Sequence, residues 1–128
     1  MPAVAVDTHA IVWYLDNDPR LFSAGAEALD RATAAGEVVC LVELTYLIEK
    51  GRIPKVARER LVVALDDPAT PRRLAPLDRS VADAMERVSR SQVPDLPDRV
   101  VYATALALGV PLVSRDGKIR ASQIRTIW

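Results

Sequence analysis

The strongest constraint in this sequence is a short apolar run near its start that leads directly into an acid. Val4, Ala5 and Val6 are followed by Asp7, with no polar residue between them. A run that is apolar at every position is typical of a strand in a parallel sheet whose two faces are both covered. The acid would then stand at the carboxyl end of the strand, where open α/β sheets place their ligand crevices. We therefore expect a binding site to be built around Asp7.

The rest of the chain alternates between strand-like and helix-like segments. Further strands are predicted at residues 37–40, around 74, and at 110–114 and 124–128. Helices are predicted at residues 10–15, 24–35 (capped by Ser23), 41–50, 55–65, from 78 or 80 to about 90, and 95–108. Strands that alternate with helices indicate an α/β domain with a mostly parallel sheet.

Size and charge define the class of protein but not its partner. A chain of 128 residues, half of them apolar, is expected to form a single domain over residues 1–128. The 17 basic and 17 acidic residues balance, so the net charge favours no partner class. A nucleic-acid partner remains compatible with this balance, because clustered carboxylates would offset a basic rim elsewhere.

Cysteine usage and hydropathy indicate a cytosolic protein without membrane contact. Cys40 is the single cysteine, so it can form neither an internal disulfide nor a cysteine-based zinc site by itself, which fits a reducing compartment. The apolar run at the start breaks at Asp7, unlike a signal peptide. No window approaches the roughly 20 apolar residues that a membrane span needs.

Four acids share one pattern, because each lies within or at the edge of an apolar segment: Asp7, Glu43, Asp98 and Asp116. Each also has an ordinary structural interpretation. Asp7 and Asp116 could be turn or capping residues. Glu43 could occupy an exposed helix face. Asp98 would favour the helix dipole at the third helical position if Asp95 capped that helix.

The combination of these acids favours a metal site. Parallel strands bring distant parts of the chain to one crevice, and at about 4 Å each pair of carboxylates would repel by roughly 4 kcal/mol. Such a cluster persists only with protons or cations between its members. Mg²⁺ and Mn²⁺ prefer carboxylate oxygens. The chain has no set of histidines and cysteines that would favour zinc, because His9 is its only histidine. An acidic metal cluster in a cytosolic α/β domain indicates phosphoryl-transfer chemistry.

Five motifs, taken together in chain order, resemble PIN-domain proteins of the VapC toxin type, and the resemblance spans essentially the whole chain. They are D-T-H at residues 7–9; Glu43 with L-I-E-K-G-R-I at 47–53; D-L-P-D-R at 95–99 with A-T-A-L at 103–106; L-V-S-R-D at 112–116; and I-W at 127–128. The resemblance implies a PIN-like (Rossmann-like) three-layer fold and a Mg²⁺- or Mn²⁺-dependent endoribonuclease.

The resemblance also assigns roles to residues. Asp7, Glu43, Asp98 and Asp116 match the acidic metal-site and catalytic residues of the family. Asp95 matches a more variable acid, and Ser114 a Thr or Ser that steadies the site. Members of this type are commonly toxins paired with a small antitoxin whose tail enters the active-site groove, and they usually form homodimers.

Two positions depart from the family pattern. Cys40 stands where the family often has Ser or Thr, and it is a weaker hydrogen-bond partner. Gly117 and Lys118 stand where many members carry a further acid. Neither change removes one of the four acids, but both leave open whether one or two metal ions bind.

Basic and aromatic residues near the acids are candidates for contact with RNA. Arg99 and Arg115, each next to one of the four acids, are the favoured phosphate contacts among Arg20, Arg72, Arg73, Arg99, Arg115, Lys118 and Arg120. His9 could reach the crevice, although a packed histidine is the commoner case. Trp13, Tyr14 and Tyr46 could stack on bases, with helix packing as the alternative for each.

Two other function classes compete with the nuclease. A PIN-like module could bind RNA or protein without cutting, although the complete set of four acids argues against loss of activity. An aspartyl-phosphate enzyme could use Asp7 as nucleophile, but the phosphatase pattern needs an Asp where this chain has His9. A dinucleotide-binding role lacks the Gly-rich turn after the first strand.

Overall fold

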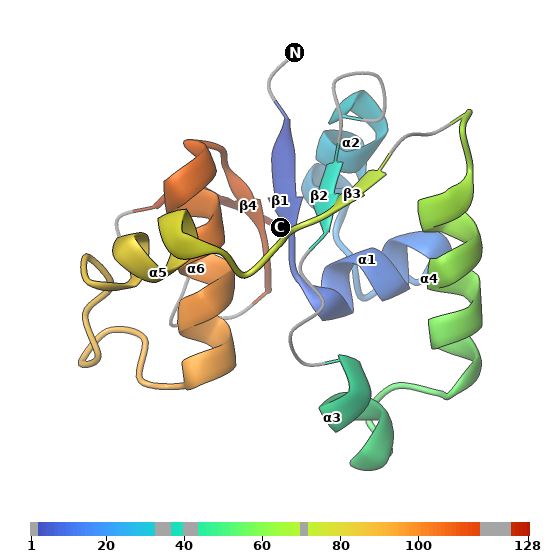
Figure 1. Ribbon diagram of the computed structural model, residues 1–128. Coiled ribbons are helices and arrows are strands. Elements are labelled where there is room, and N and C mark those ends of the chain that lie inside the picture. Colours follow the sequence, from blue (N-terminus) through green and yellow to red (C-terminus); the bar gives the residue numbers. More distant parts are fainter. Residues whose placement is uncertain (1–2, 33–36, 40–43, 70–71, 116–123) are drawn as a thin grey trace.

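The apolar run near the N-terminus forms strand β1 (Val4–Val6), the central strand of a five-stranded sheet in the computed structural model (Figure 1). The structure describes residues 3–32, 37–39, 44–69, 72–115 and 124–128. The strand order is β3-β2-β1-β4-β5, with β2 at Glu37–Val39, β3 at Arg72–Leu74, β4 at Leu112–Val113 and β5 at Thr126–Ile127. All four pairings between these strands are parallel, which confirms the predicted parallel α/β fold.

Helices cover both faces of the sheet (Figure 1). Their bounds are α1 Thr8–Leu15, α2 Ser23–Ala32, α3 Leu44–Glu49, α4 Val56–Asp66, α5 Arg79–Met85 and α6 Leu96–Leu108. Helices α1, α2 and α4 lie on one side of the sheet, and α5 and α6 pack together on the other. The molecule therefore has the three layers that the resemblance implies.

Alternating side chains of the central strands divide the core into two clusters. Val4 and Val6 of β1 and Val113 of β4 pack in the cluster beneath α1, α2 and α4. Ala5 and Leu112 belong to the cluster beneath α5 and α6. Successive residues of a strand point to opposite faces, so a strand covered on both sides must be apolar throughout. This is why β1 reads as an unbroken apolar run.

Helix ends follow the predicted capping signals in most cases. The side chain of Asp78 accepts a hydrogen bond from the Val81 N–H (3.2 Å) at the start of α5. A second bond from the Ser80 hydroxyl adds to this one, and together they lower the pKa of Asp78. Gly109 ends α6 in the left-handed conformation (φ 65°), which glycine adopts without strain.

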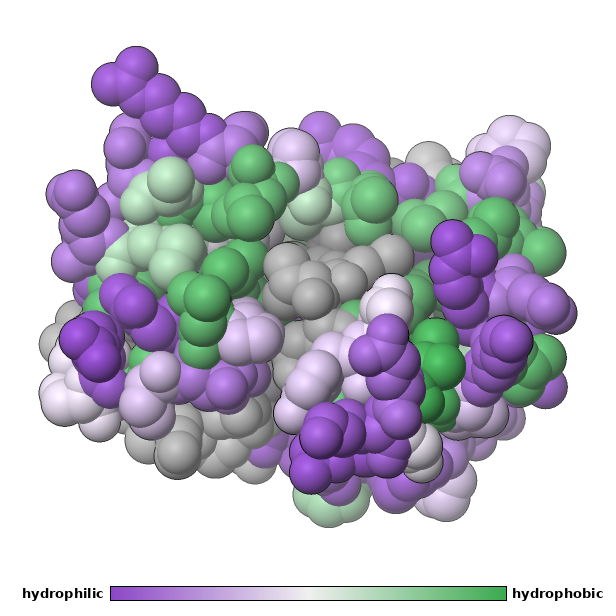
Figure 2. Space-filling view, turned by 60° about the horizontal axis from the view of Figure 1, so that its bottom comes forward, coloured by the Kyte–Doolittle hydropathy of each residue, from purple (hydrophilic) through white to green (hydrophobic). Residues whose placement is uncertain are grey.

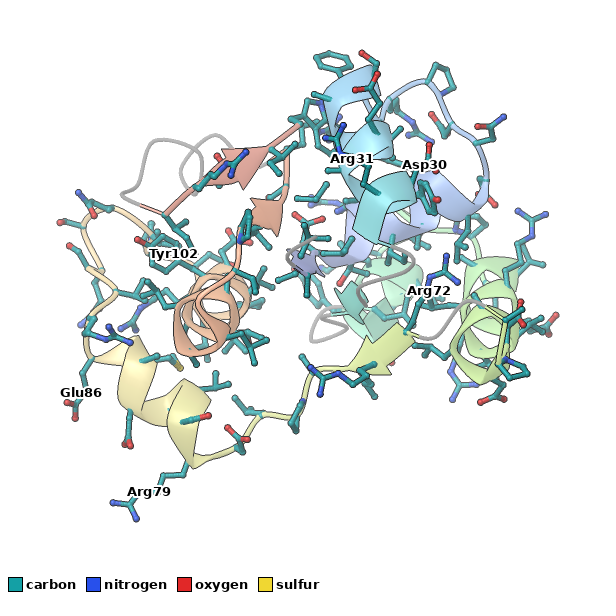
Figure 3. All side chains as sticks on the ribbon, turned by 90° about the horizontal axis from the view of Figure 1, so that it is seen from above. Asp30, Arg31, Arg72, Arg79, Glu86 and Tyr102 are labelled. Atoms are coloured by element: carbon teal, nitrogen blue, oxygen red, sulfur yellow. The ribbon has the colours of Figure 1, made fainter. Side chains whose placement is uncertain are left out.

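Several helix boundaries differ from the prediction: α1, for example, begins at Thr8 and not at residue 10. Ser23 is the first residue of α2 rather than the cap before it. Helix α5 ends at Met85, whereas the sequence predicted about residue 90. Beyond it, the Ser89 hydroxyl accepts a hydrogen bond from the Ser91 N–H (3.2 Å), a local bond that competes with a continuing helix. Arg79 and Glu86 at the two ends of this helix point outward (Figure 3).

No helix in the described part of the chain has the length and apolar character needed to cross a membrane.

Candidate active site

A pocket of about 330 Å³ lies where β1 and β4 end and where α1 and α6 begin, with α3 beside it. Its lining consists of Asp7, His9, Tyr46, Leu47, Arg52, Asp95, Asp98 and Arg115. Figure 2 brings the end of the molecule near α3 toward the reader, and hydrophilic and hydrophobic residues are interleaved on this face. The sequence predicted a crevice at this edge of the sheet.

Asp7 is held in place by the sheet and by the helix that follows it. Its N–H donates to the carbonyl oxygen of Val113 (3.2 Å), which continues the pairing of β1 with β4. Its side-chain Oδ1 accepts a hydrogen bond from the Ala10 N–H (3.0 Å), so Asp7 is the N-cap of α1. The structural and functional interpretations of Asp7 are therefore compatible, because the capping carboxylate also lines the pocket.

Asp95 and Asp98 reach the same pocket from the start of α6. Asp95 is the N-cap of this helix, and its Oδ2 accepts a hydrogen bond from the Asp98 N–H (3.4 Å). Asp98 lies in the first helical turn, where the helix dipole favours a negative charge. The capping role predicted for Asp95 is thus confirmed, and Asp98 occupies the expected position behind it.

The four predicted acids have two different outcomes. Asp7 and Asp98 come from opposite ends of the chain and line one pocket, as the sequence predicted. Glu43 and Asp116 lie outside the described residues. The same holds for Cys40, Gly117, Lys118 and Arg120. Within the described residues, no three His, Cys, Asp or Glu side chains are arranged as a metal-binding group.

Arg115, which lines the pocket, lies over a buried indole that it shares with Arg20. The guanidinium carbon of Arg115 lies 4.5 Å from the centre of the Trp13 ring, and that of Arg20 lies 4.8 Å from it. Trp13 itself is only 4% exposed. Arg20 is held by Asp18 through two bonds, from Nη2 (2.8 Å) and Nε (3.1 Å). No described carboxylate forms an ion pair with Arg115.

His9 lies between these arginines and Asp7. Its ring is tilted against Trp13, with centroids 5.2 Å apart. Burial lowers the pKa of His9 below 6.5, and the charges of Arg115, Arg20 and Arg52 lower it further. A neutral imidazole can both donate and accept a hydrogen bond, so His9 adds polarity to the pocket without adding charge.

Helix α3 and the turn after it also line the pocket. Tyr46 and Leu47 belong to the helix, and Arg52 follows Gly51, which has a left-handed backbone (φ 70°). The ammonium group of Lys50 lies 5.6 Å from the centre of the Tyr46 ring. Sequence analysis had named Tyr46 as a candidate for base stacking, and it had included Arg52 only in the L-I-E-K-G-R-I motif and not among the candidate phosphate contacts. The glycine before Arg52 was the available signal that the chain turns back there.

The structure shows what surrounds two further predicted residues, Ser114 and Arg99. Ser114 is fully buried, and its N–H donates to the carbonyl oxygen of Ile127 (3.1 Å), which joins β4 to β5. Arg99 points away from the acids, with Nη2 donating to the carbonyl oxygens of Met85 and Val88 (both 3.3 Å). This geometry favours a role for Arg99 in joining α6 to the end of α5 over the predicted contact with RNA.

Two other predicted contacts lie on the edge strand β3. Arg72 lies beside α4 (Figure 3), and Arg73 lines a separate pocket with residues of α5 and α6. Neither residue lines the acidic pocket.

The chemistry of the described pocket residues fits a hard cation. Asp7, Asp95 and Asp98 supply carboxylate oxygens, and the only histidine, His9, lies with its ring tilted against an indole. Oxygen donors suit Mg²⁺ and Mn²⁺, whereas zinc sites are normally built from imidazole and thiolate. The donor set therefore agrees with the metal class that the sequence indicated.

Comparison with known proteins identifies the family. The sequence model of the PIN domain matches residues 4–123, so the chain belongs to the PIN-domain family. Within it, the chain is of the VapC type: it is 30% identical over 132 residues to Ribonuclease VapC22 of Mycobacterium tuberculosis, and the match covers 100% of both proteins.

A solved structure supports the fold. The chain is similar to one in the crystal structure of VapBC2 from Rickettsia felis bound to a DNA fragment from their promoter. The TM-score is 0.68 with 15% sequence identity, over 98% of this chain and 97% of that one. At this identity the likeness is one of fold.

Proposed function

We propose that this protein is a Mg²⁺- or Mn²⁺-dependent endoribonuclease and the toxin of a toxin–antitoxin pair. The observation that carries the proposal is the pocket at the carboxyl edge of the sheet, where Asp7 and Asp98 meet in a PIN-domain chain. The curated relative is named a ribonuclease, and the solved structure is named as VapBC2 bound to promoter DNA. Both names agree with the proposal.

The four acids Asp7, Glu43, Asp98 and Asp116 would hold the metal ion. When bound, the ion would supply a water of lowered pKa and stabilise charge on the leaving oxygen. Asp7 is suited to this because its carboxylate is fixed by a hydrogen bond from the Ala10 N–H at the start of α1. A fixed carboxylate needs little rearrangement to bind an ion. Asp98 is placed through its backbone, whose N–H donates to the capping carboxylate of Asp95.

The other pocket residues position the substrate. Arg115 and Arg52 line the pocket together with the acids and would each contact an RNA phosphate. His9, held neutral by burial and by its cationic neighbours, would offer a hydrogen bond to the RNA. Asp95 would support the site through the backbone of Asp98.

The proposal includes two partners in the cytoplasm. A small antitoxin would occupy the acidic pocket and exclude RNA. A second copy of the chain would form a homodimer. On α4, Val56, Val62 and Val63 are 43%, 44% and 71% exposed, which leaves apolar surface that a partner would cover.

Cleavage of total cellular RNA by the purified, antitoxin-free protein tests the activity. We expect discrete fragments with Mg²⁺ or Mn²⁺ and none with EDTA. Asp98→Asn and Asp7→Asn should each lower the rate at least about 100-fold by removing a metal-binding charge. Asn is as good an N-cap as Asp, so Asp7→Asn should keep its thermal stability.

A matched control is Asp83→Asn, because Asp83 is an exposed acid on α5 whose ion pair with Arg79 is long (3.7 Å). It should cleave like the unchanged protein. Cleavage that persists in both pocket variants would contradict the site. A folded, metal-loaded protein that never cleaves would instead indicate an RNA- or protein-binding module.

A further inference from the structure

Three aromatic residues were candidates for base stacking, and the structure separates them. Trp13 is 4% exposed and packs against Trp128, with ring centroids 5.7 Å apart. The Tyr14 hydroxyl donates to Asp30 (2.6 Å), which ties α1 to α2. Tyr46 is 53% exposed and lines the acidic pocket. Of the three, Tyr46 alone presents its ring both to solvent and to the site.

The backbone that carries Tyr46 is anchored in the core. Leu44 and Leu47 are 7% and 2% exposed, and they belong to the large core cluster. Residues three apart share one face of a helix, so these two leucines fix α3 on the molecule and leave Tyr46 on another face. The turn after the helix is anchored by Ile53, which is 2% exposed. The ring is therefore exposed on a fixed support.

Two cations accompany the ring: Lys50 lies near the ring itself, and Arg52 lines the same pocket. The Lys50 ammonium lies 5.6 Å from the Tyr46 ring centre. An aromatic ring flanked by cations is the arrangement with which proteins bind single-stranded nucleic acid, because bases stack on the ring while phosphates meet the charges. Isolated exposed aromatics are common, but this one shares a pocket with the acids.

We infer that Tyr46 is a stacking platform for a nucleobase of the RNA strand that crosses the acidic pocket, with Lys50 and Arg52 holding the phosphates beside that base. The inference rests on the proposed function and adds a substrate contact to it. The two cations favour a nucleic-acid strand over a basic peptide segment, which they would repel. Stacking tolerates any base, so Tyr46 positions the strand without selecting its sequence.

Binding of two strands with the same backbone tests the inference. One is fluorescein-labelled ten-nucleotide oligoadenylate RNA, and the other is the same oligomer with abasic ribose at every position. Affinities are measured by fluorescence anisotropy in Ca²⁺, with the RNA verified as intact on a gel. The unchanged protein should bind oligoadenylate about 5- to 100-fold more tightly than the abasic strand.

Variants of Tyr46 separate stacking from a structural role. Tyr46→Ala should reduce the oligoadenylate affinity to nearly that of the abasic strand and leave the abasic affinity unchanged. Tyr46→Phe keeps the ring and should keep the preference. The matched control is Phe22→Ala, because Phe22 is 61% exposed but packs against Trp128 instead of lining the pocket. It should retain the preference for bases.

Lys50→Gln and Arg52→Gln test the phosphate contacts. Each variant should weaken the binding of both strands equally. Each should also make the slope of log affinity against log salt concentration shallower by about 0.7, the value for one phosphate contact on a single strand. An unchanged slope would overturn the role given to these cations.

Two results would overturn the role of Tyr46. One is that the unchanged protein binds the two strands with equal affinity. The other is that Tyr46→Ala loses the same factor in affinity for both strands. A peptide-binding role for this part of the pocket would give the first result. Metal-dependent RNA cleavage is scored separately: cleavage without a base preference rejects only the stacking, and a base preference without cleavage rejects only the hydrolysis.

Discussion

Two pairings of an aromatic ring with cations adjoin the acidic pocket, and they use the same residue types in opposite ways. In the first, Arg115 of the pocket lining and Arg20 lie over Trp13, whose ring is buried. In the second, Lys50 lies over Tyr46, which lines the pocket and is 53% exposed. A buried ring can only support the cations above it, whereas an exposed ring can itself contact a ligand. The comparison shows that burial, and not residue type, assigns the role.

The difference originates in the helices that carry the rings. Residues 10–13 of α1 are all buried, because this helix packs against α2, α4 and the end of the chain at Trp128. Helix α3 has six residues and buries only Leu44 and Leu47. A helix covered on several sides buries the aromatic that faces those neighbours, as α1 does with Trp13. A short helix anchored by two residues leaves the others at the surface.

The largest effect that this comparison predicts is on stability. Trp13→Ala removes a buried indole and should lower the free energy of unfolding by about 3–5 kcal/mol. Tyr46→Ala should change it by no more than about 0.5 kcal/mol, as is usual for surface positions. Urea unfolding of the two variants measures both values. Equal losses would mean that the two rings have the same structural role.

A second prediction compares the two arginines that share Trp13. Arg115→Gln should weaken binding of oligoadenylate RNA by about tenfold, because one charge-assisted contact to phosphate is lost. Arg20→Gln should have a smaller effect, since Asp18 already binds that guanidinium through both oxygens. Anisotropy titrations measure both. A larger loss for Arg20 than for Arg115 would contradict the assignment of Arg115 to the substrate.

A third prediction concerns the charge that restrains Arg20. Asp18→Asn removes the ionic partner, so Arg20 becomes available to a phosphate. RNA affinity should rise by about twofold, a gain typical of an exposed charge in water. The gain should disappear in the double variant with Arg20→Gln, which is the control. An equal rise in that double variant would mean that Asp18 acts through general repulsion of RNA.

The smallest effect is the pH dependence of this same pair. The hydrogen bonds from Arg20 lower the pKa of Asp18 from 3.8 to about 2. A carboxyl group with a depressed folded pKa stabilises the protein above its unfolded pKa, and this contribution is lost as the pH falls toward the folded value. The stability difference between the unchanged protein and Asp18→Asn should therefore shrink between pH 4 and about pH 2. Unfolding curves across that range measure it, and a constant difference would contradict the pKa shift.

Local signals in the sequence were sufficient for the fold and for part of the site. The apolar run before Asp7 predicted a strand covered on both faces, because burial on two sides excludes polar alternation. Asp95 and Gly109 marked the ends of α6, since capping depends on a few neighbouring backbone groups. The convergence of Asp7 and Asp98 followed from the geometry of a parallel sheet. Glu43 and Asp116 lie outside the described residues, so their place in the site remains a prediction.

Directions of side chains could not be predicted in the same way. Arg99 follows Asp98 directly and was expected at the substrate, yet it donates to carbonyl oxygens at the end of α5. Directly after that end, the N–H groups of Arg87 and Val88 donate to the carbonyl oxygens of Ala84 and Met85, in turns that do not continue the helix. The contact joins two helices, so neither helix alone reveals it.

The sequence by itself determined the parallel α/β fold, the capped helices and the acids that end up at the carboxyl edge, because each follows from local patterns and from the fixed geometry of strands and helices. Only the tertiary structure decided that Trp13 is buried, that Tyr46 is exposed and that Arg115 stands beside Asp7. Exposure is a property of everything packed around a residue, and elements distant in sequence supply most of that packing.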